Sequence, residues 1–309
     1  FYRVALRLDP NNSAIYLNLG NLFFEQKRFQ EADSFYEGAI NILPSYAEAH
    51  FNRGNSLLSL QRIDEAELSY QMALKIRPDY AEVHNGLGNL LKSQKRFKEA
   101  EEAFQVALSL FPEYVNAYIN LGELFNEQSY FEKAENCYKK AIQIEPDCSE
   151  AYNNLAGLMV KQKEYRKAEN IYLIALSIEP ERAELHNNCG LLFKEQKRYK
   201  EAIKSYHRAI NLDSKYIGVY WNLGDLLVEQ KQYKEAISVY KTALGLCPDN
   251  EDVCLNLSLV LLSLGRFKEG WQGYESRLKH SVSVRSLNYI QESWKSDVFF
   301  TEKAKKQTI

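Results

Sequence analysis

The prolines of this chain fall on a fixed lattice, and this lattice constrains the fold more than any other feature. All seven are separated by multiples of 34 residues, at Pro10, Pro44, Pro78, Pro112, Pro146, Pro180 and Pro248. The one vacant lattice point is Ser214. A fixed period of this length indicates an array of stacked repeats rather than one large core, so a binding function would lie on a surface.

Alignment on the prolines divides the chain into repeats, and positions are counted from the first residue of each. Seven complete repeats cover residues 13–250, a partial one covers 1–12, and a degenerate one covers 251–278. The partial repeat leads us to expect that the natural protein extends further. Residues 279–309 show no clean helical period, and we expect a short tail or a truncated linker there.

Small and large residues alternate at fixed positions. Position 8 is Gly in six of the eight repeats, and the second helix carries a ring at position 24 between alanines at positions 20 and 27, as in Ala134, Tyr138 and Ala141. Spacings of four and three place these residues on one helical face. Because Gly costs about 1 kcal/mol relative to Ala in a helix, its recurrence predicts close approach of the partner helix. Proline then ends the second helix.

These positions resemble the tetratricopeptide repeat family, most clearly in residues 116–122 with Ala134, Tyr138, Ala141 and Pro146. The resemblance covers residues 1–278. It implies an all-α, right-handed α-solenoid of tandem 34-residue helix-turn-helix units. It also implies a scaffold for protein–protein interaction, whose first helices line a concave groove.

Catalytic and metal-binding patterns are missing from the sequence. His50, His84 and His186 all occupy position 4, where other repeats carry Tyr, so we expect packing roles rather than a metal site. No phosphate-binding Gly loop, nucleophile elbow or Cys/His metal spacing occurs. Charged runs such as residues 195–198 fall at the turn between the helices, where we expect solvation. The sequence therefore predicts a non-enzymatic protein without cofactor or metal.

Composition limits the class of partner and the cellular compartment that we expect. The formal net charge of −2, from 39 basic and 41 acidic residues, argues against nucleic acid as a partner. The apolar stretches are too short to span a membrane. Five cysteines without Cys-x-x-Cys spacing predict reduced, mostly packed thiols and favour an intracellular, cytoplasmic protein, although a Cys247–Cys254 bridge is an alternative.

Position 6 of the first helix carries Asn in seven of the eight repeats, and only Gly86 interrupts the series. Asn is a mediocre helix former, so helix propensity does not explain seven copies. Position 6 is turned by about 100° from the buried position 7. An amide can donate to and accept from a peptide backbone, which predicts binding of an extended polypeptide. The alternative is that each Asn bonds to the neighbouring repeat or simply recurs in the family.

Two further residues join this set. Asn89 is one of several additional amides on the first helices, and Trp221, at position 5, offers an apolar or stacking anchor, with packing as the alternative. The predicted peptide-binding residues are Asn18, Asn52, Asn120, Asn154, Asn188, Asn222, Asn256, Asn89 and Trp221.

The asparagine row also resembles the repeat arm of O-GlcNAc transferase, in which corresponding amides hold extended substrates. Residues 270–277, read with Trp294, resemble the junction between repeats and a glycosyltransferase domain in bacterial proteins. The alternative function is therefore a substrate-recruiting region of a larger glycosyltransferase, whose catalytic domain would lie outside this chain. Self-association through terminal repeats is a further alternative.

Overall fold

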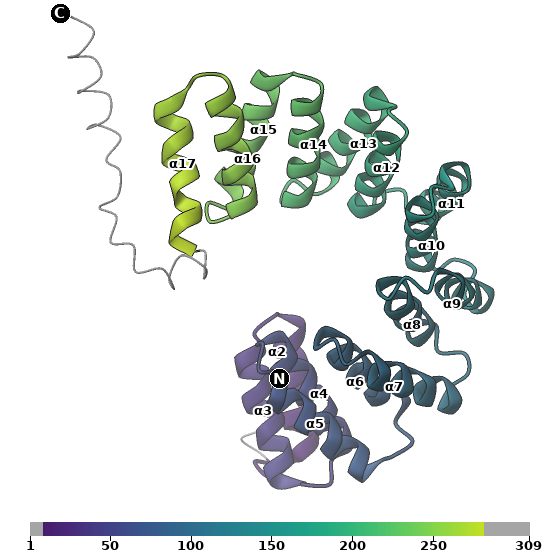
Figure 1. Ribbon diagram of the computed structural model, residues 1–309. Helices are drawn as coiled ribbons and strands as arrows, with labels where there is room; N and C mark the ends of the chain where they lie inside the picture. The colour runs from purple at the N-terminus through teal and green to yellow at the C-terminus, as the bar shows by residue number, and fades with distance from the viewer. Residues whose placement is uncertain (1–8, 281–309) are drawn as a thin grey trace, which may run out of the picture. The chain divides into compact units, whose positions relative to one another are not determined.

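The computed structural model describes residues 9–280, which form sixteen α-helices and no strands. The helices pair as hairpins in chain order (Figure 1). The first helices have 13 residues each: α2 (Ser13–Glu25), α4 (Ala47–Ser59), α6 (Ala81–Ser93), α8 (Val115–Glu127), α10 (Ser149–Lys161), α12 (Ala183–Glu195), α14 (Ile217–Glu229) and α16 (Glu251–Ser263). The second helices have 14: α3 (Phe29–Ile42), α5 (Ile63–Ile76), α7 (Phe97–Leu110), α9 (Phe131–Ile144), α11 (Tyr165–Ile178), α13 (Tyr199–Leu212), α15 (Tyr233–Leu246) and α17 (Phe267–His280). These tandem hairpins confirm the all-α repeat fold.

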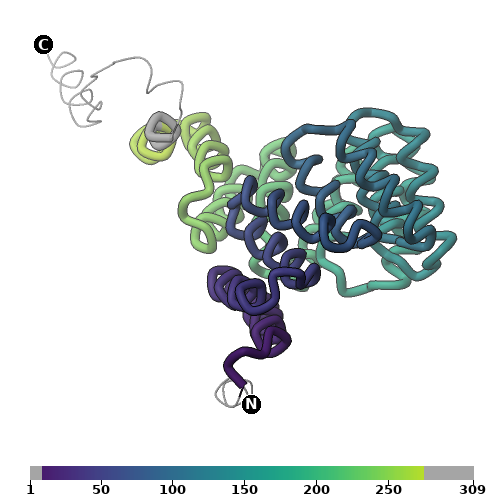
Figure 2. The backbone as a smooth tube through the Cα atoms, turned by 90° about the horizontal axis from the view of Figure 1, so that it is seen from below, coloured from purple at the N-terminus to yellow at the C-terminus, as the bar shows by residue number. Residues whose placement is uncertain are grey.

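The chain divides into two compact units, Phe1–Gln162 and Lys163–Ile309. In the first unit the consecutive first helices α2, α4, α6, α8 and α10 contact one another, and in the second unit α12, α14 and α16 do the same. The tube view shows each hairpin beside the next along the chain within a unit (Figure 2). The first helices therefore form a continuous layer in each unit.

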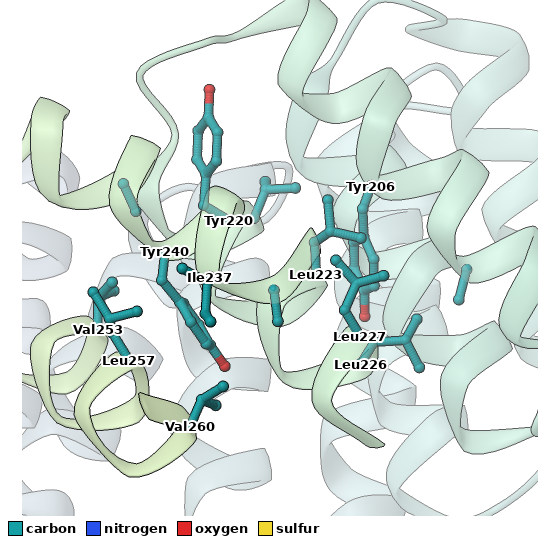
Figure 3. Close-up of a cluster of buried hydrophobic side chains, with 14 of the residues drawn as sticks. Tyr206, Tyr220, Leu223, Leu226, Leu227, Ile237, Tyr240, Val253, Leu257 and Val260 are labelled. Atoms are coloured by element: carbon teal, nitrogen blue, oxygen red, sulfur yellow. The ribbon is translucent and has the colours of Figure 1, made fainter. Parts of the chain in front are cut away.

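In the six repeats with glycine at position 8, the ring at position 24 packs against that glycine. A methyl group on Gly122 would lie 2.5 Å from Cε1 of Tyr138, and one on Gly88 would lie 2.6 Å from Cε1 of Phe104. Both rings are fully buried. This confirms the predicted close approach of the two helices. Figure 3 shows two such rings, Tyr206 and Tyr240, in the core of the second unit.

The second helices end at the same position with or without proline. The amide of Leu43 donates to the carbonyl of Ala39 at 2.9 Å before Pro44, and the amide of Asp213 donates to Ala209 at 2.9 Å before Ser214. Helix α13 thus ends in register although proline is missing. Packing of the hairpin is sufficient to set the boundary, and proline reinforces it.

The turn inside each hairpin uses a left-handed residue. At Lys95 φ is 62°, and the amides of Lys95 and Arg96 donate to the carbonyls of Lys92 and Leu91, each at 2.9 Å. This is a Schellman ending, in which Gly is usual. Seven hairpins place a residue other than Gly there, and the eighth has Gly265.

Cysteines and helix lengths add two observations. All five cysteines are free thiols, and burial raises the pKa of Cys137 to about 11.

None of the described helices combines the length and apolar character needed to cross a membrane. The tail predicted from residue 279 lies almost entirely outside the described residues, as does Trp294.

Candidate peptide-binding face

Positions 2, 6, 9 and 13 of the first helices lie within about 60° of one another around the helix axis. We call this surface the first-helix face. Its side chains are partly or fully exposed in all eight repeats, whereas position 8 is buried in each of them. Because consecutive first helices contact one another, the face is continuous within each unit.

The position-6 amides hold neighbouring repeats together. Five of the seven donate Nδ2–H to an oxygen of the preceding repeat: Asn52 to Asn21 at 2.9 Å, Asn120 to Asn85 at 2.9 Å, Asn154 to Glu123 at 3.2 Å, Asn222 to Asn187 at 2.9 Å and Asn256 to Asp225 at 2.9 Å. Asn188 accepts from Asn187 at 3.2 Å, and Asn18 is exposed. The inter-repeat bonds that the sequence offered as an alternative are therefore present.

Core rings hold two of the acceptors in place. The Tyr36 hydroxyl donates to Oδ1 of Asn21 at 2.8 Å, and the Tyr240 hydroxyl donates to Oδ1 of Asp225 at 2.5 Å. Burial first, and then the Asp225 carboxylate, raise the pKa of Tyr240, so this hydroxyl keeps its proton. Each chain of bonds runs from a buried ring through position 9 to the position-6 amide of the next repeat, which fixes the orientation of that amide.

These bonds leave part of each amide available. An Asn side chain has two N–H donors and a carbonyl oxygen with two lone pairs, and one inter-repeat bond uses a single donor. In the described part of the chain, Oδ1 of Asn52, Asn120, Asn154, Asn222 and Asn256 accepts no hydrogen bond. The oriented amides can therefore still pair with a polypeptide backbone.

The interruption of the asparagine row at Gly86 coincides with a free amide one turn further along α6. In three other repeats the hydroxyl of the Tyr at position 24 donates to the side chain at position 9, as Tyr70 does to Asn55 at 2.7 Å. Here the ring is Phe104, which has no hydroxyl. Asn89 is half-buried and makes no hydrogen bond within residues 9–280. Position 9 can thus supply the amide that position 6 lacks.

Trp221 lies on the surface of the second unit. Its side chain is 40% exposed, whereas Leu17, Ile119 and Asn187 at the same position are at most 5% exposed. Leu191 and Leu259, at position 9 of the flanking repeats, are also exposed. Packing within the unit therefore leaves much of the indole free for a ligand.

The position-4 histidines close the junction between repeats. Nε2 of His50, His84 and His186 lies 3.0, 2.9 and 2.9 Å from the carbonyl oxygens of Pro44, Pro78 and Pro180. At the vacant lattice point the Tyr220 hydroxyl donates to the Ser214 carbonyl at 3.0 Å. Residues 9–280 contain no cluster of His, Cys, Asp or Glu suited to a metal ion. In each of these repeats the histidine follows the proline by six residues, and this constant spacing in the sequence indicates the contact.

The charged turns are more structured than we expected from the sequence. Arg198 pairs with Glu201 at 2.6 Å and with Glu169, one repeat earlier, at 2.7 Å. Arg62 and Arg96 form the same two contacts in the first unit, with Glu65 and Asp33 and with Glu99 and Glu67. These arginines link adjacent second helices, so the turn charges are only partly solvated.

Comparison with known structures shows the same architecture. A structure from a functional characterisation of Pseudomonas aeruginosa pilF is 21% identical in sequence, with a TM-score of 0.58, over 70% of this chain and 97% of that one. The Cut9–Hcn1 hetero-tetramer of the APC/C is 18% identical, with a TM-score of 0.64, over 84% of this chain and 51% of that one. These similarities establish the fold. A comparison with curated proteins finds no match.

Sequence profiles of the repeat match most of the chain. Profiles described as tetratricopeptide repeat match residues 1–33, 47–80, 79–147 and 127–188, and one described as TPR repeat matches residues 190–230 and 224–265. Together with the paired helices and the glycine–ring contacts, these matches show that the chain belongs to the tetratricopeptide repeat family.

Proposed function

We propose that this protein is a non-enzymatic interaction scaffold that binds an extended polypeptide along the first-helix face. The observation that carries the proposal is the row of position-6 amides. Five of them are oriented by bonds to the preceding repeat, and their carbonyl oxygens accept no hydrogen bond within residues 9–280: Asn52, Asn120, Asn154, Asn222 and Asn256. Groups held in place before binding lose little conformational entropy when a ligand arrives. An amide that contacts the backbone holds many sequences in the same way.

The test must separate ligand contact from repeat packing, since Asn120 serves both. Asn120→Ala removes the amide together with its bond to Asn85, whereas Asn85→Ala removes only the bond, because Asn85 is 8% exposed. Isothermal titration with a library of extended peptides should show about tenfold weaker binding for Asn120→Ala and a smaller loss for Asn85→Ala, which keeps the amide of Asn120 but no longer holds it in place. Equal affinities for wild type and a folded Asn120/Asn154/Asn188 triple alanine variant would contradict the proposal.

The substrate-recruiting role in a larger glycosyltransferase rests on the sequence of residues 270–277. It shares the binding mode described above and differs only in requiring a catalytic domain. Sequencing the gene downstream of Ile309 tests it directly, because a stop codon at that point would exclude the role for this polypeptide.

A further inference from the structure

In the second unit the carboxylate of Asp225 is held in position by hydrogen bonds but forms no ion pair with a Lys, Arg or His of the described residues. Oδ1 of Asp225 accepts from the Tyr240 hydroxyl and from Nδ2 of Asn256, which fixes the plane of the carboxylate. In the described part of the chain, Oδ2 accepts no hydrogen bond and no Lys, Arg or His lies within ion-pair distance. A half-buried carboxylate of this kind favours a cationic partner.

The first unit shows how an internal cation would be supplied. Glu123 also stands at position 9 and pairs with Lys92, at position 12 of the preceding repeat, at 2.7 Å. Lys194 occupies the equivalent place before Asp225 but forms no ion pair with it. The shorter aspartate side chain therefore leaves its outer oxygen available.

Three neighbouring features shape the space around this carboxylate. Trp221 precedes Asp225 by one turn of α14, so the two side chains are neighbours on one face. Gly218, one turn earlier still, has no side chain to cover the indole, and no cation lies over the Trp221 ring within the described residues. Beneath the face, the fully buried Tyr206 hydroxyl has no hydrogen-bond partner within residues 9–280, and burial first, then the charge of Asp225, raise the pKa of Tyr206.

The acidic residues around Asp225 favour a positively charged ligand group. Glu195, Glu229 and Asp252 lie on the first-helix face of this unit, all exposed and none in an ion pair within residues 9–280. Within residues 9–280, Lys194 is the one Lys or Arg of helix α12. Leu191 and Leu259, exposed at position 9 of the two flanking repeats, would contact the aliphatic part of a long side chain bound there.

We propose that Trp221 and Asp225 form a binding site for an arginine side chain of the docked polypeptide. A guanidinium stacks on an indole and donates two parallel N–H bonds to a carboxylate, which a compact ammonium does not. The site rests on the proposed function, since it assumes a polypeptide along the first-helix face. The Trp221–Asp225 site would give a preference for arginine to the first-helix face, whose proposed amide contacts are with the ligand backbone.

The test uses two peptides that differ at one residue, arginine or its neutral isostere citrulline. Titration of the full chain should show about tenfold tighter binding of the arginine peptide, with the difference declining as salt rises. Asp225→Asn should abolish this difference without unfolding the protein, because Asn21 makes the same two bonds at position 9 of its own repeat. Trp221→Leu should reduce it severalfold.

Glu235→Gln is the matched control, because Glu235 lies in the first turn of second helix α15 and carries the same charge. Equal affinity of the two peptides for the wild type overturns the arginine site while leaving backbone binding intact. An arginine preference that survives Asp225→Asn overturns it as well. About tenfold weaker binding of both peptides by Asn120→Ala, with the arginine preference retained, supports both proposals.

Discussion

Glu123 in the first unit and Asp225 in the second occupy the same position of the repeat and behave differently. Glu123 reaches Lys92 of the preceding repeat at 2.7 Å, whereas Asp225 forms no ion pair, although Lys194 stands at the equivalent place. One methylene separates an acid that is satisfied inside the unit from one that is available to a ligand. Ligand preference in such an array can therefore change without any change in the backbone.

The neighbouring position 5 reinforces this contrast. Leu17, Asn85 and Ile119 of the first unit are buried there, as is Asn187 of the second unit, whereas Trp221 of the second unit is 40% exposed. The backbone, the glycine–ring contacts and the amide row are common to both units. The predictions below test whether the scaffold is common and whether the difference lies in a few side chains.

The largest effect should come from breaking the common scaffold. Gly122→Val places a branched side chain against the Tyr138 ring, where even a methyl group would lie 2.5 Å from Cε1. We expect a loss of about 3 kcal/mol in the free energy of unfolding, measured by urea denaturation.

Gly245 provides the control for that substitution. It lies in α15 with no atom within 4 Å of an added Cβ, so Gly245→Ala should raise stability by up to about 1 kcal/mol. Similar losses for both variants would show that the glycine–ring contact does not determine the packing.

Acid should weaken the ion pairs at the start of the second helices, where Arg62 pairs with Glu65 and Arg96 with Glu99. Hydrogen bonds from Arg62 and Arg96 lower the pKa values of Glu65 and Glu99 below the ordinary value. Because the folded-state pKa is depressed, this stabilisation is complete above the unfolded-state value of about 4.3 and is lost as pH falls through the folded-state value. The urea midpoint should therefore drop between about pH 5 and pH 3.

Arg96→Gln sharpens this measurement, since Gln232 stands at the equivalent position of the second unit. We expect a shallower dependence of the urea midpoint on pH for this variant. An unchanged slope would mean that other carboxylates dominate the acid transition.

Asp225→Glu should convert the second unit toward the first. The longer acid can reach Lys194 as Glu123 reaches Lys92, so stability should rise by about 0.5 kcal/mol. Affinity for the arginine peptide should fall about fivefold, as measured by titration. A variant that binds the arginine peptide more tightly would contradict the idea that an internal cation competes with the ligand.

The smallest effect concerns the hairpin turn. Lys95 has φ of 62°, a conformation that costs a lysine more than a glycine. We expect Lys95→Gly to raise the free energy of unfolding by roughly 0.5 kcal/mol, after the added freedom of the unfolded chain is subtracted. Gly265→Lys should produce the opposite change in the eighth hairpin, and a loss of stability in Lys95→Gly would contradict the argument.

The fold could be predicted from the sequence because its determinants are local and periodic. Gly88 and Phe104 show why, since their positions within one repeat already define the contact that the structure contains. The chemistry of the face could not be predicted in the same way. Asn89 is left without a bond because the ring of its repeat is Phe104, which has no hydroxyl, whereas Asp225 accepts from the hydroxyl of Tyr240. Whether an acid at position 9 forms an ion pair also depends on whether a lysine one repeat earlier reaches it, as Lys92 reaches Glu123. Such pairings depend on side-chain length and orientation, which spacing alone does not give.

The constant helix lengths of 13 and 14 residues have a consequence for the size of the bound segment. Adjacent packed helices are about 10 Å apart, and an extended chain advances about 3.3 Å per residue, so one hairpin spans about three ligand residues. Under the proposed binding mode, each hairpin would therefore contact a ligand segment of the same length. Removal of one whole repeat, such as residues 81–114, would shorten the bound segment by about three residues and leave the spacing of the remaining contacts unchanged.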